Sequence, residues 1–218
     1  KIANLVNGHS TAKAAVDAGA VKLEYIVDVA MEDGEVMAWL LATIPQYAKE
    51  KDNVEWRLPL HLAAFNNKPE GVIKALLDVY PDAAKEKGYA GYLPFHYAAE
   101  KQMDAGAVKA ILAAYPDAVK ASDRMGALPL HSAASSNKSA AVVKVVLDAY
   151  PAALKEKDKG GMLPLHYAAL NKAEPVVKMM YTAYPDAVME ADNHGKLPKD
   201  HFPAGRPASI KAILTEPL

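Results

Sequence analysis

The sequence contains no cysteine, which excludes a disulfide framework and thiolate metal sites. It also lacks any apolar run near the roughly 20 residues that a membrane-spanning helix requires, because charged residues interrupt its apolar stretches. No glycine-rich phosphate loop is present, since the pair Gly160-Gly161 has neither the preceding strand nor the spacing of a nucleotide site. A nucleophile elbow is missing as well. These absences predict a protein without a cofactor or catalytic residues, whose function resides in a surface.

An excess of charge of one sign is absent too. The 25 basic and 26 acidic residues leave a formal net charge of -1, and the two signs are mixed along the chain. No basic patch is visible, so a nucleic-acid partner is not expected. The hydrophobic fraction of 51% over 218 residues predicts a soluble folded chain with a substantial core. The chain begins with Lys1, which indicates a processed product or a fragment, and its compartment stays open between the cytoplasm and an organelle such as a plastid.

What the sequence has in abundance is repetition. The phrase Leu-Pro-Leu-His, once Leu-Pro-Phe-His, begins at residues 58, 93, 128 and 163, in steps of 35. A second phrase, Tyr-Pro-Asp-Ala or Tyr-Pro-Ala-Ala, begins at residues 80, 115, 150 and 184 and keeps nearly the same register. A period of this length is typical of a solenoid, in which each unit buries its apolar faces against its neighbours.

Each unit is predicted to contain two antiparallel helices. Leu-Pro opens a short first helix, because the fixed φ and missing N–H of proline suit the first helical turn. After a polar break comes a second helix, predicted over 140–150 in one unit, where Val142, Val146 and Leu147 share one face. Tyr-Pro then opens a further helical turn. The alanine pair that follows each Leu-Pro phrase predicts close approach of adjacent first helices, at residues 63–64, 98–99, 133–134 and 168–169.

The unit resembles the ankyrin repeat, whose first helix opens with Thr-Pro-Leu-His-x-Ala-Ala after an Asp-x-x-Gly turn. Asp123 and Gly126 match that turn, whereas in the first unit Asn53 replaces the Asp and Trp56 the Gly. Leucine stands where threonine is usual, which removes a capping hydroxyl and predicts an apolar contact instead. The long unit and the Tyr-Pro-Asp-Ala phrase are similar to ankyrin proteins of algae and related protists. The resemblance implies an all-α, ankyrin-type helix-turn-helix repeat solenoid.

Four full repeats are expected between two degenerate ends. The ends lack the complete phrase, as do capping units whose outer faces meet water. The expected division is an N-terminal segment with a degenerate capping repeat at 1–52, full repeats at 53–87, 88–122, 123–157 and 158–191, and a degenerate C-terminal capping repeat at 192–218.

The histidines invite a metal or catalytic hypothesis. Equivalent positions in stacked repeats lie about 10 Å apart, whereas a zinc ligand lies about 2 Å from its metal, so no two of the repeated histidines can share one ion. A structural role at the neighbouring turns is favoured, and no metal site is expected. Ser135 and Ser136 near His131 resemble a nucleophile and base only in composition. The repeated set is His61, His96, His131 and His166; the others, to which no role is assigned, are His9, His194 and His201.

In ankyrin arrays the turn tips and the exposed side of the first helix form a concave face that receives a partner protein. The corresponding positions here vary from repeat to repeat. In the first two repeats they concentrate aromatic and arginine side chains, the types that dominate interface energetics. Packing of some aromatics within their own turns is the alternative. The candidate partner-binding residues are Trp56, Arg57, Phe65, Tyr89, Tyr92, Arg124, Met125 and Met162.

The sequence therefore predicts a non-catalytic scaffold for protein–protein interaction. One alternative is a permanent structural or linker subunit of a large complex, for example an organellar, photosynthetic one. An obligate subunit would bury a larger and more hydrophobic contact. Another alternative is a fragment of an enzyme whose catalytic domain lies outside these 218 residues.

Overall fold

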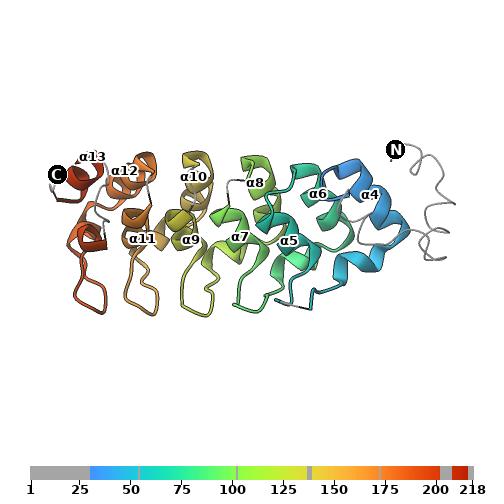
Figure 1. Cartoon of the computed structure of the whole chain (residues 1–218), viewed down its shortest axis with the longest axis horizontal. Helices are drawn as coiled ribbons and strands as arrows, with labels where there is room; N and C mark the ends of the chain where they lie inside the picture. Colours follow the sequence, from blue (N-terminus) through green and yellow to red (C-terminus); the bar gives the residue numbers. More distant parts are fainter. Residues whose placement is uncertain are drawn as a thin grey trace.

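The described part of the chain is a row of stacked helical units (Figure 1). The computed structural model describes residues 30–53, 55–101, 103–136, 139–171, 173–201 and 208–215. Within these ranges the regular structure is helical and no strand occurs. None of the helices there is long and apolar enough to cross a bilayer. The all-α repeat solenoid predicted from the sequence is confirmed.

The helices form two parallel rows, with the connecting turns projecting from one side (Figure 1). The first helices are α5 (Pro59–Phe65), α7 (Pro94–Glu100), α9 (Pro129–Ser136) and α11 (Pro164–Leu170). The second helices are α6 (Glu70–Val79), α8 (Ala105–Ala114), α10 (Ala140–Ala149) and α12 (Glu174–Ala183). Short 3-10 helices follow them at Pro81–Lys85, Pro116–Lys120, Pro151–Lys155 and Pro185–Met189. The ends of the described chain hold α4 (Gly34–Thr43), the 3-10 helices Pro45–Lys49 and Pro198–His201, and α13 (Ala208–Thr215).

The first helices begin as the Leu-Pro phrase predicts, but a histidine supplies part of the cap that leucine cannot. The backbone N–H of Leu93 donates to Nδ1 of His96 at 3.1 Å, and the N–H of His96 donates to the carbonyl oxygen of Leu93 at 3.0 Å. This satisfies groups that a helix N-terminus otherwise leaves unpaired. The predicted apolar contact of the leucine is also present, since Leu93 is buried. The same Leu–His hydrogen bond recurs in the other full units at 3.2, 3.0 and 3.0 Å.

The core runs along the whole array between the two rows of helices. Its members include the paired alanines, which are fully buried between successive first helices. Larger side chains such as Phe95 and Leu130 fill the space between the rows. The tyrosines of the Tyr-Pro phrase pack against this core, and the preceding unit covers two of them with a lysine: Lys49 lies over Tyr80 at 5.2 Å and Lys155 over Tyr184 at 5.1 Å.

The described ends of the chain continue the stack. Helix α4 packs on α6 so closely that a Cβ added to Gly34 would lie 2.6 Å from the backbone of Gly71, which only glycine permits. Helix α13 packs on α12. The restart of the Leu-Pro phrase at residue 197 forms only a 3-10 helix. Most of the N-terminal segment with the degenerate capping repeat, predicted over 1–52, lies outside the described residues, which begin at residue 30.

Candidate functional site

The turns before the first helices form a continuous ridge. Each turn is closed internally: the N–H of Asp123 donates to the carbonyl of Ala127 at 3.0 Å, and Oδ1 of Asp123 accepts the N–H groups of Met125 and Ala127. Each turn is also tied to the preceding one by a backbone hydrogen bond. These bonds run from the N–H of Tyr89 to Glu55, of Arg124 to Ala90, of Lys159 to Met125 and of Asn193 to Gly160, at 2.9 to 3.1 Å. The ridge is therefore a fixed platform, not a set of independent loops.

In the first turn the structure differs from the sequence prediction in the position of the aspartate. The aspartate that closes it is Asp52, so Asn53 does not replace the Asp as predicted. Oδ1 of Asp52 accepts the N–H groups of Glu55 and Arg57, and Nε of Arg57 donates to Oδ2 at 2.8 Å. Because this turn has one more residue than the others, the sequence register shifts by one position. Burial alone would raise the pKa of Asp52, but the bonds from Arg57 and the backbone lower that pKa to about 2.

Trp56 occupies the position that glycine holds in the other turns. Its φ is 54°, in the left-handed region, where Gly91, Gly126, Gly161 and Gly195 have φ of 74 to 79°. A bulky residue is rare in this conformation, and its presence at such a position points to function when the side chain is free. The side chain of Trp56 is 64% exposed.

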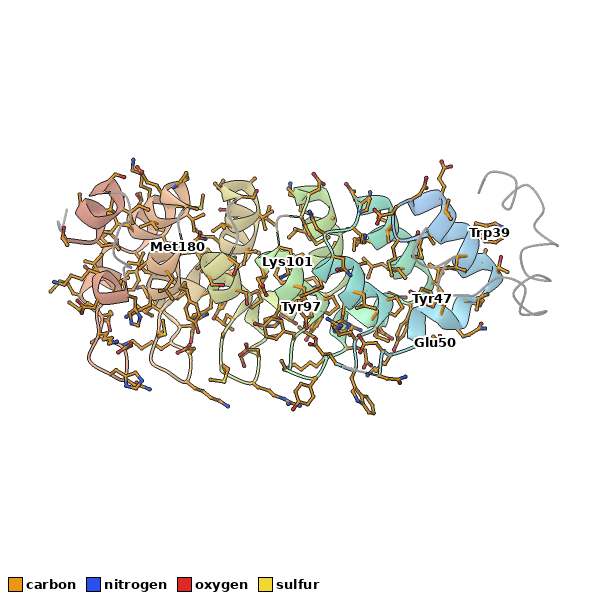
Figure 2. The ribbon with its side chains drawn as sticks, viewed as in Figure 1. Trp39, Tyr47, Glu50, Tyr97, Lys101 and Met180 are labelled. Carbon is orange, nitrogen blue, oxygen red and sulfur yellow. The ribbon has the colours of Figure 1, made fainter. Side chains whose placement is uncertain are left out.

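A mixed aromatic and cationic cluster lies beside this turn, on the first helices. Phe65 packs edge-on against Tyr97, with ring centroids 5.6 Å apart. Two cations cover the Phe65 ring: Arg57 at 5.3 Å and Lys101 at 4.5 Å. Lys101 also pairs with Glu100 at 2.9 Å. Figure 2 labels Tyr97 and Lys101 in the same part of the array.

A second cation–π pair sits at the tip of the ridge. The guanidinium of Arg124 lies 4.5 Å from the centre of the Tyr89 ring. Tyr89 remains 62% exposed, and Met125 on the neighbouring tip is 64% exposed. This pair joins the turns of two successive units at the level of their side chains, in addition to the backbone bond.

Three of the candidate residues are not free tip residues: Arg57, which is half-buried and paired with Asp52 and Glu55, Tyr92 and Met162. Tyr92 is half-buried, packs on the core and lies 5.0 Å from the ring of Tyr97. Burial raises the pKa of the Tyr92 phenol. Met162, also half-buried, lies in the turn of the fourth full unit, apart from the aromatic cluster. The alternative to partner binding, that some aromatic residues pack within their own turns, therefore applies to Tyr92.

A side-chain contact that was not predicted from the sequence recurs behind the ridge. The hydroxyl of Tyr167 donates to Oδ2 of Asp158 at 2.6 Å, and Nε2 of His201 lies 2.8 Å from Oδ2 of Asp192. Burial and the bond to Asp158 both raise the pKa of Tyr167, and the pKa of Asp192 falls to about 2, chiefly because it accepts the N–H of Lys196. The sequence contains a signal for these pairs. In each pair the turn aspartate lies nine residues before the variable x position of the Leu-Pro-Leu-His-x-Ala-Ala phrase.

Two of the four repeated histidines, His131 and His166, contact the carbonyl oxygen of a residue in the next turn. Nε2 of His131 lies 3.1 Å from the carbonyl oxygen of Met162 in the next turn, while its Nδ1 accepts the Leu128 N–H. Both ring nitrogens are occupied, so His131 cannot serve Ser135 as a base, and the Ser135 hydroxyl donates to the Ser132 carbonyl instead. Among the described residues no group of three or more His, Asp or Glu side chains could hold a metal ion.

The paired rows of helices, the turn ridge and the Leu–His caps together define a helix-turn-helix repeat solenoid. A family model described as Ankyrin repeats (3 copies) matches residues 95–191, so this part of the chain consists of ankyrin repeats. Ankyrin repeats generally mediate protein–protein interaction and are typically non-catalytic. The search of curated proteins found no match to the chain.

Proposed function

We propose that this protein is a non-catalytic scaffold that binds a partner protein through the tip face. We define the tip face as the turn ridge together with the exposed side of the first helices. The proposal rests on the distribution of apolar surface. Seven large hydrophobic side chains are exposed among the described residues, and only Val79 and Met189 lie elsewhere. The five on the tip face are Trp56, Phe65, Tyr89, Met125 and Leu170.

The first two full repeats, 53–87 and 88–122 in the proposed division, are the centre of this surface. They carry Trp56, Phe65 and Tyr89, and the cations Arg57 and Lys101 hold the Phe65 ring in place. Side chains that are already ordered lose less conformational entropy on binding, which favours affinity. Large aromatic residues on such a platform are the usual energetic anchors of a protein interface.

Site-specific photo-cross-linking tests where the partner binds. Benzoylphenylalanine placed at Tyr89 is expected to cross-link a partner in an extract of the source organism, and the same group at Val79, exposed on α6, is expected to capture none. Mass spectrometry then identifies the adduct. Capture of one protein from Val79 and not from Tyr89 would place the interface on the second helices and contradict the proposal. Capture of several proteins from both positions would favour a permanent subunit of a larger complex.

The Trp56→Gly variant is expected to weaken partner binding without a matching loss of the free energy of unfolding. Glycine relieves the strain of the positive φ but makes the unfolded chain more flexible, so the free energy of unfolding is expected to stay within about 1 kcal/mol of wild type. Binding of the cross-linked partner is expected to weaken by about 2 kcal/mol, the scale of an interface hot spot. Chemical denaturation and calorimetric titration measure the two quantities.

The matched control for this substitution introduces a side chain, in place of glycine, at the equivalent position of the third full unit. A Cβ added to Gly126, whose φ is 79°, would lie 3.0 Å from the backbone nitrogen of Lys159. Gly126→Ala is therefore expected to lower the free energy of unfolding by about 1 kcal/mol or more. If Trp56→Gly lowered the free energy of unfolding by clearly more than about 1 kcal/mol, as Gly126→Ala is expected to do, Trp56 would be a packing residue and not a binding anchor.

A further inference from the structure

The ridge carries three cations that no carboxylate neutralises. Elsewhere in the described chain most basic side chains form salt bridges, for example Lys74 with Glu70 and Lys157 with Glu190. Arg124, Lys159 and Lys196 form none among the described residues. These three lie on three successive turns, from the third full unit to the C-terminal unit. All three are exposed.

The acidic residues of the same turns are directed inward. Oδ1 of Asp158 accepts the N–H groups of Gly160 and Met162, and its Oδ2 accepts the Tyr167 hydroxyl. Asp192 is 7% exposed and accepts two backbone N–H groups and the bond from His201. Asp123 accepts two backbone N–H groups through Oδ1. The turns therefore present their positive side chains to solvent while their negative ones stabilise the backbone.

Two of the cations are held in position before any partner arrives. The Arg124 guanidinium stacks on Tyr89, and the ammonium of Lys159 donates to the carbonyl oxygen of Arg124 at 2.8 Å. Glu55 is the acidic group at the other end of the ridge, and it is paired with Arg57 at 3.1 Å. Asp200, near Lys196, accepts the N–H of Leu197 through Oδ2. The positive row is thus continuous over three turns.

Resting on the proposed function, we infer that the partner contributes an acidic segment that runs along the ridge, with carboxylates on Arg124, Lys159 and Lys196 and an apolar side chain near Tyr89 and Met125. Successive turns lie about 10 Å apart, the spacing of packed helices. A chain in the polyproline II conformation advances about 3.1 Å per residue and has three residues per turn, so an acidic residue at every third position lies on one side of the segment and places one carboxylate at each turn. Complementary charge of this kind sets specificity and association rate.

A labelled peptide tests this inference without knowledge of the natural partner. The probe is a fluorescein-labelled peptide that repeats Glu-Ser-Leu, with a Lys-Ser-Leu peptide and a single-stranded oligonucleotide of equal length beside it. Fluorescence anisotropy is expected to show binding of the Glu peptide only. The triple variant Arg124→Gln/Lys159→Gln/Lys196→Gln is expected to weaken that binding about tenfold or more, which corresponds to about 1.4 kcal/mol.

The control removes the same charge from three lysines outside the ridge, in the 3-10 helix Pro81–Lys85 and in α10 and α12. Lys85, Lys144 and Lys178 are exposed and paired with Asp82, Asp148 and Glu174. Their triple glutamine variant is expected to bind the Glu peptide with an affinity within about twofold of wild type, because charges a Debye length away are screened. Equal losses in both triple variants would overturn the inference, as would equal binding of the oligonucleotide or no binding of the Glu peptide. In each of these cases a cross-link from Tyr89 to a protein would leave the proposed function standing.

Discussion

Leu130→Ala is expected to lower the free energy of unfolding by about 2 to 5 kcal/mol, the range for truncating a buried leucine. Leu130 is 1% exposed and lies on α9, which packs against α7 on one side and α11 on the other. Because each repeat is stabilised only by its own packing and that of its neighbours, a cavity in a central unit weakens both interfaces. Denaturation followed by far-ultraviolet circular dichroism measures the effect.

Val79→Ala is the control for this substitution. Val79 also lies in a helix but is 38% exposed, and alanine has the higher helix propensity, so its free energy of unfolding is expected to change by no more than about 0.5 kcal/mol. A loss at Leu130 as small as that at Val79 would mean that the centre of the array is not closely packed. It would also contradict the assignment of the Leu-Pro-Leu-His phrase to the core.

The fold could be predicted from the sequence because every unit repeats the same local signals. Pro129 at the start of α9 and the Tyr-Pro phrase at its fixed offset mark the helix boundaries without reference to distant contacts. The one register error, at Asp52, arose where the turn gained a residue. A single inserted residue cannot be detected from the spacing of the repeats. Asp52 is recognised as the aspartate that closes the turn only by the backbone N–H groups that it accepts.

The candidate site was harder to predict, because exposure depends on packing between units. Tyr89 and Tyr92 are three residues apart in one turn, yet Tyr89 stacks under Arg124 at the tip whereas Tyr92 packs on the core beside Tyr97. The sequence identified both as aromatic residues at variable positions. Only the location of the neighbouring unit distinguishes a tyrosine that stays exposed at the tip from one that supports the turn.

A second large loss of stability is expected as the pH is lowered. The imidazoles of His61 and His96 are fully buried, and burial lowers the pKa of each to about 4 in the folded protein. Their Nε2 atoms have no hydrogen-bond partner, although the carbonyls of Tyr92 and Ala127 stand at the equivalent positions and partly offset the effect of burial. Burial also lowers the pKa of His131 and His166.

These pKa shifts determine in which direction the free energy of unfolding changes with pH, and over which pH range. Above the unfolded-state pKa of about 6.5 the histidines are neutral in both states, and stability is complete. As the pH falls below that value the unfolded chain binds protons that the folded protein cannot accept until about pH 4, so stability falls. Between about pH 7.5 and pH 5, His61 and His96 together are expected to cost on the order of 4 kcal/mol. The carboxyls of Asp52 and Asp192, whose pKa values are about 2, titrate below this window.

Glutamine variants assign the acid effect to individual histidines. Glutamine at the third helical position can accept the Leu93 N–H as the imidazole does, but it does not titrate. His96→Gln is therefore expected to remove about half of the loss contributed by His61 and His96 between about pH 7.5 and pH 5, whereas His194→Gln, at an exposed turn position, is expected to leave it unchanged. Denaturation curves at each pH give the comparison. A wild-type free energy of unfolding that stays constant across this range would show that the buried imidazoles accept protons in the folded array, which the closed packing of the Leu–His caps does not allow.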